Sequence, residues 1–217
     1  MLTNLHSTVR ALALGALAGI ALLAAGCSQG PSTDKIGSGD MSAGKADAPI
    51  TVVEYASVAC PICARMNQAA MSTFMSKYVD TGKVHYIYRP MMTGNPAVSV
   101  AGHLLAQCAG PDKSFKVVDA IMRSQEEMDQ GSSHPEEYAN ARTVLTRIAQ
   151  SVGLTDEQFN KCVTDPKGVQ ALNDAHDKAI KDGVDGTPTF FVNGKKIPLQ
   201  KYDMSDLDNA IQPLLKK

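Results

Sequence analysis

The 217-residue sequence predicts an α/β fold in which an all-helical domain interrupts a smaller domain that contains the sheet. Three observations support this prediction. Residues 50–89 have the pattern of a strand, a helix and a second strand. Residues 97–183 have helical periodicity throughout, and residues 189–217 return to two short strands and a final helix. The order of elements is therefore βαβ, a helical block, and ββα.

The βαβ unit begins with residues 50–56, which are apolar and β-branched enough to form a strand buried in a sheet. Residues 60–80 then carry apolar side chains, Phe74 among them, at the spacing of a helix. Residues 84–89 form the second strand, and Gly82 supplies the turn that leads into it. These three elements predict one βαβ unit.

The helical block is divided by glycines, prolines and caps. The expected helices span residues 97–109, 114–127 and 135–152, a short segment after Thr155, and about 166–183. Thr155 and Gln158 form a capping box for the short helix, which carries Cys162. Gly153 and Gly183 end the helices that precede them.

The chain then returns to β structure. Residues 189–192 form a strand, Asn193-Gly194 supplies a two-residue turn, and residues 195–199 form its partner strand. In the last helix, four apolar residues share one face: Leu207, Ile211, Leu214 and Leu215. The complete order is that of a thioredoxin fold with a helical insertion in its middle.

This order assigns domains to the whole chain. Residues 48–96 and 184–217 are expected to form the thioredoxin domain, and residues 97–183 the helical insertion domain. The charge balance of 21 basic and 22 acidic residues offers no basic surface for nucleic acid. Removing residues 1–26 takes away one basic residue, Arg10, and leaves a net charge of −2.

Residues 1–26 have the features of a signal peptide. A basic residue, Arg10, precedes an apolar run over residues 11–25. About 15 apolar residues are too few for a comfortable transmembrane helix. The chain is therefore expected to be exported, and its periplasmic localisation follows from that expectation.

The residues around Cys27 indicate how the exported chain is held. The sequence Leu23-Ala24-Ala25-Gly26-Cys27 resembles a bacterial lipobox, in which the cysteine is lipidated after cleavage. Lipidation of Cys27 would anchor the protein in the inner or the outer membrane. The alternative is ordinary cleavage that leaves a free cysteine. Residues 27–47 contain almost no large apolar side chains and predict a flexible tether.

Cys60-Pro61-Ile62-Cys63 lies where the first strand gives way to a helix. Pro61 suits the first helical turn. Cys60 at the helix N-terminus faces unpaired N–H groups and the positive end of the helix dipole, which favour a thiolate. A second sulfur in Cys63 can then resolve a mixed disulfide. The alternatives are a structural disulfide or half of a zinc site, which would need two further ligands that are not nearby.

Gly186-Thr187-Pro188-Thr189-Phe190 is the second informative segment, because a proline that opens a strand after a glycine can be cis. A trans proline is the alternative. With the cysteine pair and the helical insertion, this segment makes residues 48–217 resemble the periplasmic DsbA-like thiol:disulfide oxidoreductases.

The resemblance implies a role for each residue of this segment and of the cysteine pair. Cys60 would be the nucleophile and Cys63 the buried resolving sulfur of a redox-active disulfide, with no cofactor and no metal. Pro188 would be cis beside the sulfurs, and the backbone of Thr187 would pair with an extended substrate.

Glu54 and a second cysteine pair complete the predicted site. Burial of Glu54 in the middle of a strand should raise its pKa. The resemblance implies that Glu54 accepts or relays a proton as Cys63 ionises; a partly solvated acid at a strand end is the alternative. DsbA-like proteins of the α-proteobacterial type carry a second disulfide, which implies a bond between Cys108 and Cys162. The alternative is two buried free cysteines.

Two residues bear on the direction of electron flow. Ile62 stands where strongly oxidising relatives have histidine, and Thr187 stands where the type oxidase has valine. We therefore expect a potential below that of the strongest oxidases and above that of thioredoxin. The expected partners are cysteine-containing exported proteins and an unidentified redox partner. The short polar tether cannot form a dimerisation domain, so a monomer is expected.

Two alternatives come from other classes of protein. Cys60 and Cys63 could hold Cu(I) with a third soft or imidazole ligand, as in copper-handling proteins of the same fold. A non-catalytic lipoprotein scaffold is the other alternative. Four histidines lie in the predicted domains, and each is more typical of a structural position than of a ligand: His85, His103, His134 and His176.

Overall fold

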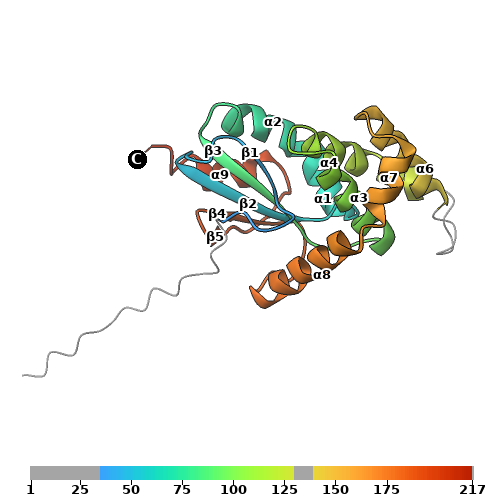
Figure 1. Cartoon of the computed structure of the whole chain (residues 1–217). Helices are drawn as coiled ribbons and strands as arrows, with labels where there is room; N and C mark the ends of the chain where they lie inside the picture. Colours follow the sequence, from blue (N-terminus) through green and yellow to red (C-terminus); the bar gives the residue numbers. More distant parts are fainter. Residues whose placement is uncertain (1–34, 130–138, 217) are drawn as a thin grey trace, which may run out of the picture.

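The computed structural model describes residues 35–129 and 139–216 (Figure 1). The signal peptide, the predicted lipidation site Cys27 and His134 lie outside the described residues. Within the described ranges, no helix is both long and apolar enough to cross a membrane.

The centre of the molecule is a five-stranded mixed sheet in the order β1-β3-β2-β4-β5. Its strands are β1 (Met41–Ala43), β2 (Ile50–Ala56), β3 (Val84–Pro90), β4 (Thr189–Val192) and β5 (Lys195–Lys196). Central strand β2 runs parallel to β3, with Ile50 opposite Val84, and antiparallel to β4, with Tyr55 opposite Thr189. This register brings the end of β2, which leads into Cys60, beside the start of β4, which follows Pro188.

The predicted tether is wrong in its last part, because residues 41–43 form edge strand β1 antiparallel to β3. Met41 is only 6% exposed and joins the core. Asp40 forms a nearly buried ion pair with Arg89 at 2.7 Å, and Arg89 also donates to the carbonyl oxygen of Lys35. Apolar burial and one ion pair therefore order a segment whose polar composition predicts flexibility.

The helix predicted for residues 60–80 is continuous but not uniform. It runs through α1 (Pro61–Met66), η1 (Asn67–Met71), α2 (Ser72–Phe74) and η2 (Met75–Val79), where η1 and η2 have π-helical geometry. Its buried face packs on the sheet through Phe74, whose ring lies 5.3 Å from that of Tyr86. Helix α9 (Met204–Ile211) contacts the same helix, and Tyr78 donates a hydrogen bond to Asp208 of α9 at 2.6 Å.

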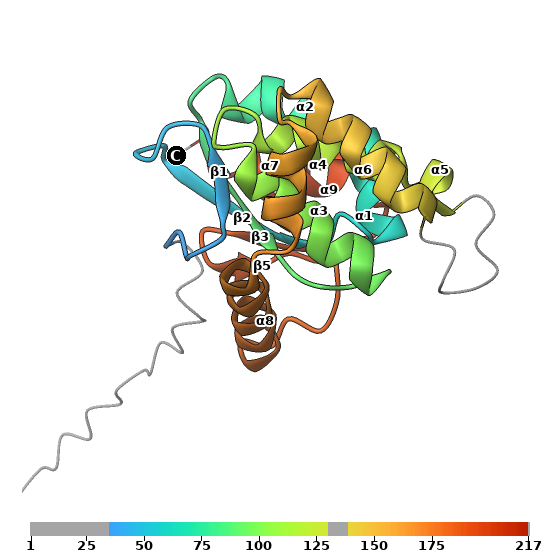
Figure 2. The ribbon, with the colours of Figure 1, turned by 45° about the vertical axis from the view of Figure 1, so that its right-hand side comes forward.

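Between β3 and β4 the described chain is helical. The helices are α3 (Pro96–Cys108), α4 (Ser114–Arg123), α5 (Gln125–Asp129), α6 (Ala139–Ser151), α7 (Asp156–Val163) and α8 (Pro166–Lys181). Helices α3, α4, α6 and α7 contact one another as a bundle, whereas α8 extends away from this bundle (Figures 1 and 2). The helix predicted over residues 114–127 is broken at Ser124, so that α4 and α5 are separate.

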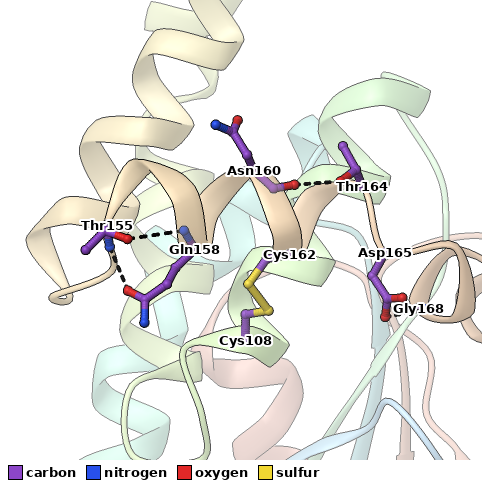
Figure 3. The surroundings of a disulfide bond; sticks show 8 residues. All are labelled: Cys108, Thr155, Gln158, Asn160, Cys162, Thr164, Asp165 and Gly168. Atoms are coloured by element: carbon purple, nitrogen blue, oxygen red, sulfur yellow. Dashed lines mark hydrogen bonds between the residues drawn. A yellow bond between two sulfur atoms is a disulfide. The ribbon is translucent and has the colours of Figure 1, made fainter.

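Cys108 and Cys162 are joined by a disulfide that links the last residue of α3 to α7 (Figure 3). The predicted Thr155–Gln158 capping box is confirmed at the start of α7, where both of its hydrogen bonds are formed. The two cysteines are separated by 54 residues and their Cα atoms by 6.1 Å. In the chain-entropy model, closing a loop of this length stabilises the fold by about 4 kcal/mol.

Candidate active site

Cys60 is the N-cap of α1, with extended backbone angles of φ −87° and ψ 121°. Its Sγ accepts a hydrogen bond from the Cys63 backbone N–H at 3.4 Å, and its own N–H donates to the Ser57 carbonyl oxygen at 3.1 Å. Pro61 occupies the first helical position, where an N–H would have no partner inside the helix. The sequence pattern predicts this placement, and the structure has it.

The two cysteines are both free thiols, so the pair is in its reduced form. Cys60 is 7% exposed and Cys63 is fully buried. Of the two sulfurs, only that of Cys60 is accessible to a substrate. This is expected if Cys60 is the attacking sulfur and Cys63 the resolving sulfur. Oxidation of this pair to a disulfide stays a proposal.

The surroundings of Cys60 lower its pKa from 9.0 to about 5, chiefly because the Cys63 side chain hydrogen-bonds to its sulfur. The Thr187 side chain and the backbone N–H groups of Cys63 and Ile62 act in the same direction, whereas burial opposes them. The pKa of Cys63 is raised well above its usual value by burial, by its bond to Cys60 and by the charges of Cys60 and Glu54. At neutral pH the pair is therefore one thiolate and one thiol.

Residues 186–188, which precede β4, lie beside the Cys60 sulfur. The Thr187–Pro188 peptide bond is cis, and Pro188 is buried. The Thr187 carbonyl oxygen lies 3.5 Å from Cys60 Sγ and can accept its S–H hydrogen bond. Thr189 stabilises the turn by donating its hydroxyl to the Gly186 carbonyl oxygen at 2.7 Å. The structure thus brings together two segments separated by more than a hundred residues.

Glu54 lies beneath the cysteines in β2 and is only 3% exposed, so the alternative of a partly solvated acid is wrong. The Tyr86 hydroxyl donates a hydrogen bond to its carboxylate. Burial raises the pKa of Glu54 to about 7; the Tyr86 bond lowers it, and the charge of Cys60 raises it further. Glu54 can therefore hold or release a proton near neutral pH.

A cavity of about 280 Å³ reaches Glu54 between α4 and the helical segment over residues 67–75. Methionine and aromatic side chains form much of its wall, and polar residues lie towards the surface. The residues that line it include Glu54, Met71, Met75, Tyr86, Met122, Asn67, Asp119 and Arg123. The carboxyl group of Glu54 is therefore buried among side chains but adjoins a space that leads outward.

Four residues contact the active-site segment without being indicated by the sequence pattern: Ser57, Thr93, Gly94 and Gln125. Gln125 of α5 donates to the carbonyl oxygens of Val58 and Cys60 at 2.7 and 3.2 Å. Gly94 has φ +78°, and a Cβ there would lie 2.1 Å from the Ala59 carbonyl oxygen. A loop glycine beside a strand end is the one signal that could have drawn attention to this region.

The buried histidine His103 is structural. Its side chain is fully buried, and its Nε2 lies 3.4 Å from the Val58 nitrogen and 3.1 Å from the Tyr88 hydroxyl. Burial lowers its pKa to about 3. Among residues 35–129 and 139–216, no group of three or more His, Cys, Asp or Glu side chains could hold a metal ion. The copper alternative gains no support from this part of the chain.

Comparisons with known proteins agree with the geometry of the site. The chain matches the family model described as Thioredoxin over residues 37–212. It is 32% identical over 189 residues to a Rickettsia bellii protein named "Putative protein-disulfide oxidoreductase", covering 85% of this chain and 68% of that protein. A protein of the same class from Rickettsia typhi is 31% identical, and the chain spans 64% of its length.

Solved structures show the same fold. The crystal structure of Wolbachia pipientis α-DsbA1 matches with a TM-score of 0.70 and 26% identity, covering 82% of this chain and 91% of that one. BdbD from Bacillus subtilis matches with a TM-score of 0.69 at 22% identity, covering 83% and 95%, and shows the fold alone. The chain belongs to the thioredoxin family, and within it to the DsbA-like thiol:disulfide oxidoreductases.

Proposed function

We propose that this protein is a periplasmic enzyme that exchanges electrons between its Cys60/Cys63 pair and the cysteines of other exported proteins. The observation that carries the proposal is the asymmetry of the pair. Cys60 has a pKa of about 5 and borders the surface, whereas Cys63 is buried with a pKa well above the usual value. A stable thiolate is a good leaving group and makes the reduced form favourable, which is the property of a disulfide donor.

In the oxidising direction, a substrate thiolate attacks Cys60 Sγ of the oxidised pair. The Cys60–Cys63 bond breaks, Cys63 leaves as a thiolate, and a mixed disulfide forms between the substrate and Cys60. A second substrate thiolate then attacks the substrate sulfur of the mixed disulfide and expels the Cys60 thiolate. The substrate loses two electrons to the cysteine pair, and a redox partner that accepts them restores the disulfide.

Glu54 is proposed to supply the proton that the Cys63 thiolate requires when it leaves. Its pKa of about 7 allows it to be protonated before the step and ionised after it. The charge of Glu54 also raises the pKa of Cys63, which favours the protonated thiol. In the reverse direction the same carboxylate accepts the Cys63 proton as the thiol attacks.

Thr187 is proposed to hold the substrate. Its carbonyl oxygen lies beside Cys60 Sγ at the opening of β4, and its side chain is half-buried. An extended peptide can pair with backbone in this position while its cysteine reaches Cys60. The cis Pro188 shapes this segment. The proposal also includes lipidation of Cys27 and anchoring in a membrane, both of which require export. It further includes a monomeric state.

The test is oxidation of a reduced, unfolded protein with native disulfides by the pre-oxidised chain, measured as regained activity of that protein. Wild type should transfer its disulfide stoichiometrically, and Cys60→Ser should transfer none. Cys63→Ala should accumulate a mixed disulfide through Cys60, visible on non-reducing gels. A wild-type chain that transfers no disulfide and a Cys63→Ala variant that traps no protein would together favour the non-catalytic scaffold.

A further inference from the structure

Thr93 lies where three segments around Cys60 meet. Its Oγ1 is 2.5 Å from the Thr187 Oγ1, and its carbonyl oxygen accepts a hydrogen bond from the Ser57 hydroxyl at 2.7 Å. The Ser57 Oγ in turn accepts the Ala59 N–H at 3.2 Å. Thr93 therefore contacts Thr187, the residue proposed to hold the substrate, through its side chain. Through its backbone it contacts Ser57 in the segment before Cys60.

The next residue fixes the position of this loop. Gly94 approaches the backbone of Ala59 and Cys60 so closely that no Cβ fits, and its positive φ of 78° suits glycine. Asn95 then caps α3 by accepting the Val98 N–H. A side chain at residue 93 is thus held between a close backbone contact and a helix cap. Its hydroxyl has little freedom to move away from Thr187.

The direction of the hydrogen bond between the two hydroxyls has a chemical consequence. The Thr187 carbonyl oxygen lies 3.5 Å from Cys60 Sγ, and the Thr187 side chain contributes to the lowered pKa of Cys60. A threonine hydroxyl has one proton to donate and two lone pairs to accept with. If Thr93 donates to Thr187 Oγ1, the Thr187 proton remains available for the sulfur. A hydroxyl dipole held in this orientation near a thiolate favours its negative charge.

We propose that Thr93 is a positioning residue whose hydroxyl hydrogen-bonds Thr187 Oγ1 and so holds Thr187 beside the Cys60 sulfur. The inference rests on the proposed function and extends the machinery of that site to the loop between β3 and α3. It assigns to Thr93 a part in setting the leaving-group quality of Cys60 without contact with the substrate.

The test measures the thiolate fraction of Cys60 by ultraviolet absorbance against pH in the reduced protein. With a pKa of about 5, Cys60 is about half ionised at pH 5. Losing a hydrogen bond worth roughly 0.5–1.5 kcal/mol in Thr93→Val should lower that fraction about two- to sevenfold. Thr93→Ser keeps the hydroxyl and should restore the wild-type value. Thr73→Val, an exposed threonine on α2, is the matched control and should change nothing.

A double-mutant cycle shows whether Thr93 acts through Thr187. In a Thr187→Val background, adding Thr93→Val should leave the Cys60 titration unchanged, because the intermediate hydroxyl is already absent. Cys63, Glu54 and Tyr88, the titratable groups whose charges interact with Cys60, are present in every variant. If Thr93→Val does not fold, Thr93→Ala gives the same comparison with less bulk.

An unchanged or increased thiolate fraction in Thr93→Val would overturn the inference, as would an equal effect in the Thr187→Val background. These outcomes are independent of the proposed function, because the titration needs no substrate. A wild-type chain that fails to transfer disulfides would instead overturn the proposed function and leave the inferred role of the Thr93–Thr187 contact untouched. Disulfide transfer by Thr93→Val should persist, since both cysteines remain.

Discussion

Replacing Glu54 by glutamine should remove a pH-dependent loss of stability from the reduced protein. Glu54 is 3% exposed, and burial raises its pKa from 4.5 to about 7. Between these values the folded protein holds a proton that the unfolded chain has released, so its stability falls as pH rises. From pH 5 to pH 8, a single group with these two pKa values costs about 2.5 kcal/mol of unfolding free energy.

The assay is equilibrium unfolding in urea at pH 5 and at pH 8, with the chain kept reduced. The fall in unfolding free energy between the two pH values should be about 2 to 3 kcal/mol smaller in Glu54→Gln than in wild type. Cys60 contributes in the opposite direction, because its lowered pKa of about 5 adds stability as pH rises, but it does so in both proteins. The comparison between the two proteins therefore isolates the effect of Glu54.

Asp206 in α9 provides the matched control, since it is another buried acid. Its carboxylate accepts backbone N–H groups of Gln200, Lys201 and Tyr202, which stabilise its charge. Asp206→Asn should therefore destabilise the fold at pH 8, whereas Glu54→Gln should not. Equal pH dependence in Glu54→Gln and wild type would refute the reasoning that burial of this carboxyl controls its titration.

Two further predictions concern packing and cross-linking. Gly94→Ala should destabilise the fold by several kcal/mol more than Gly110→Ala. Both glycines have positive φ, but a Cβ at Gly94 would lie 2.1 Å from the Ala59 carbonyl oxygen, whereas one at Gly110 meets nothing within 4 Å. Equal losses of unfolding free energy in urea would contradict this prediction. Replacing Cys108 and Cys162 together by alanine should lower the unfolding free energy by about 4 kcal/mol while leaving disulfide transfer intact, and a loss of transfer in a folded variant would contradict a purely structural role.

The residues that the sequence could predict are those with a local pattern. Cys60 and Cys63 form a motif, Pro188 follows a glycine turn, and Glu54 interrupts an apolar strand, so each is visible within a few residues. The strand pattern also predicts the burial of Glu54, because β2 lies at the centre of the sheet with neighbours on both sides.

Thr93, Ser57 and Gln125 have no such pattern. The contact of Thr93 with Thr187 spans 94 residues, and that of Gln125 with Val58 spans 67. Both depend on how loops and helix ends meet after folding, which no periodicity encodes. A polar residue in a loop is ordinary in sequence, and only its partner shows what it does.

The ordered residues before β2 could not be predicted for a different reason. Composition predicts flexibility when few apolar side chains are available for burial. Here Met41 enters the core, Ala43 packs against it, and the Asp40–Arg89 ion pair joins a polar segment to β3. Pairing with the edge of a sheet adds backbone hydrogen bonds that do not depend on side-chain composition.

The central claim is tested most directly by the reduction potential of the Cys60/Cys63 pair, measured by equilibration with glutathione buffers. A Cys60 pKa of about 5 lies between the values of about 7 in thioredoxin and about 3.5 in DsbA. Each unit below that of thioredoxin raises the potential by about 30 mV, which predicts about −210 mV. A potential at or below about −270 mV, the value of thioredoxin, would contradict a stabilised thiolate that makes this pair a disulfide donor.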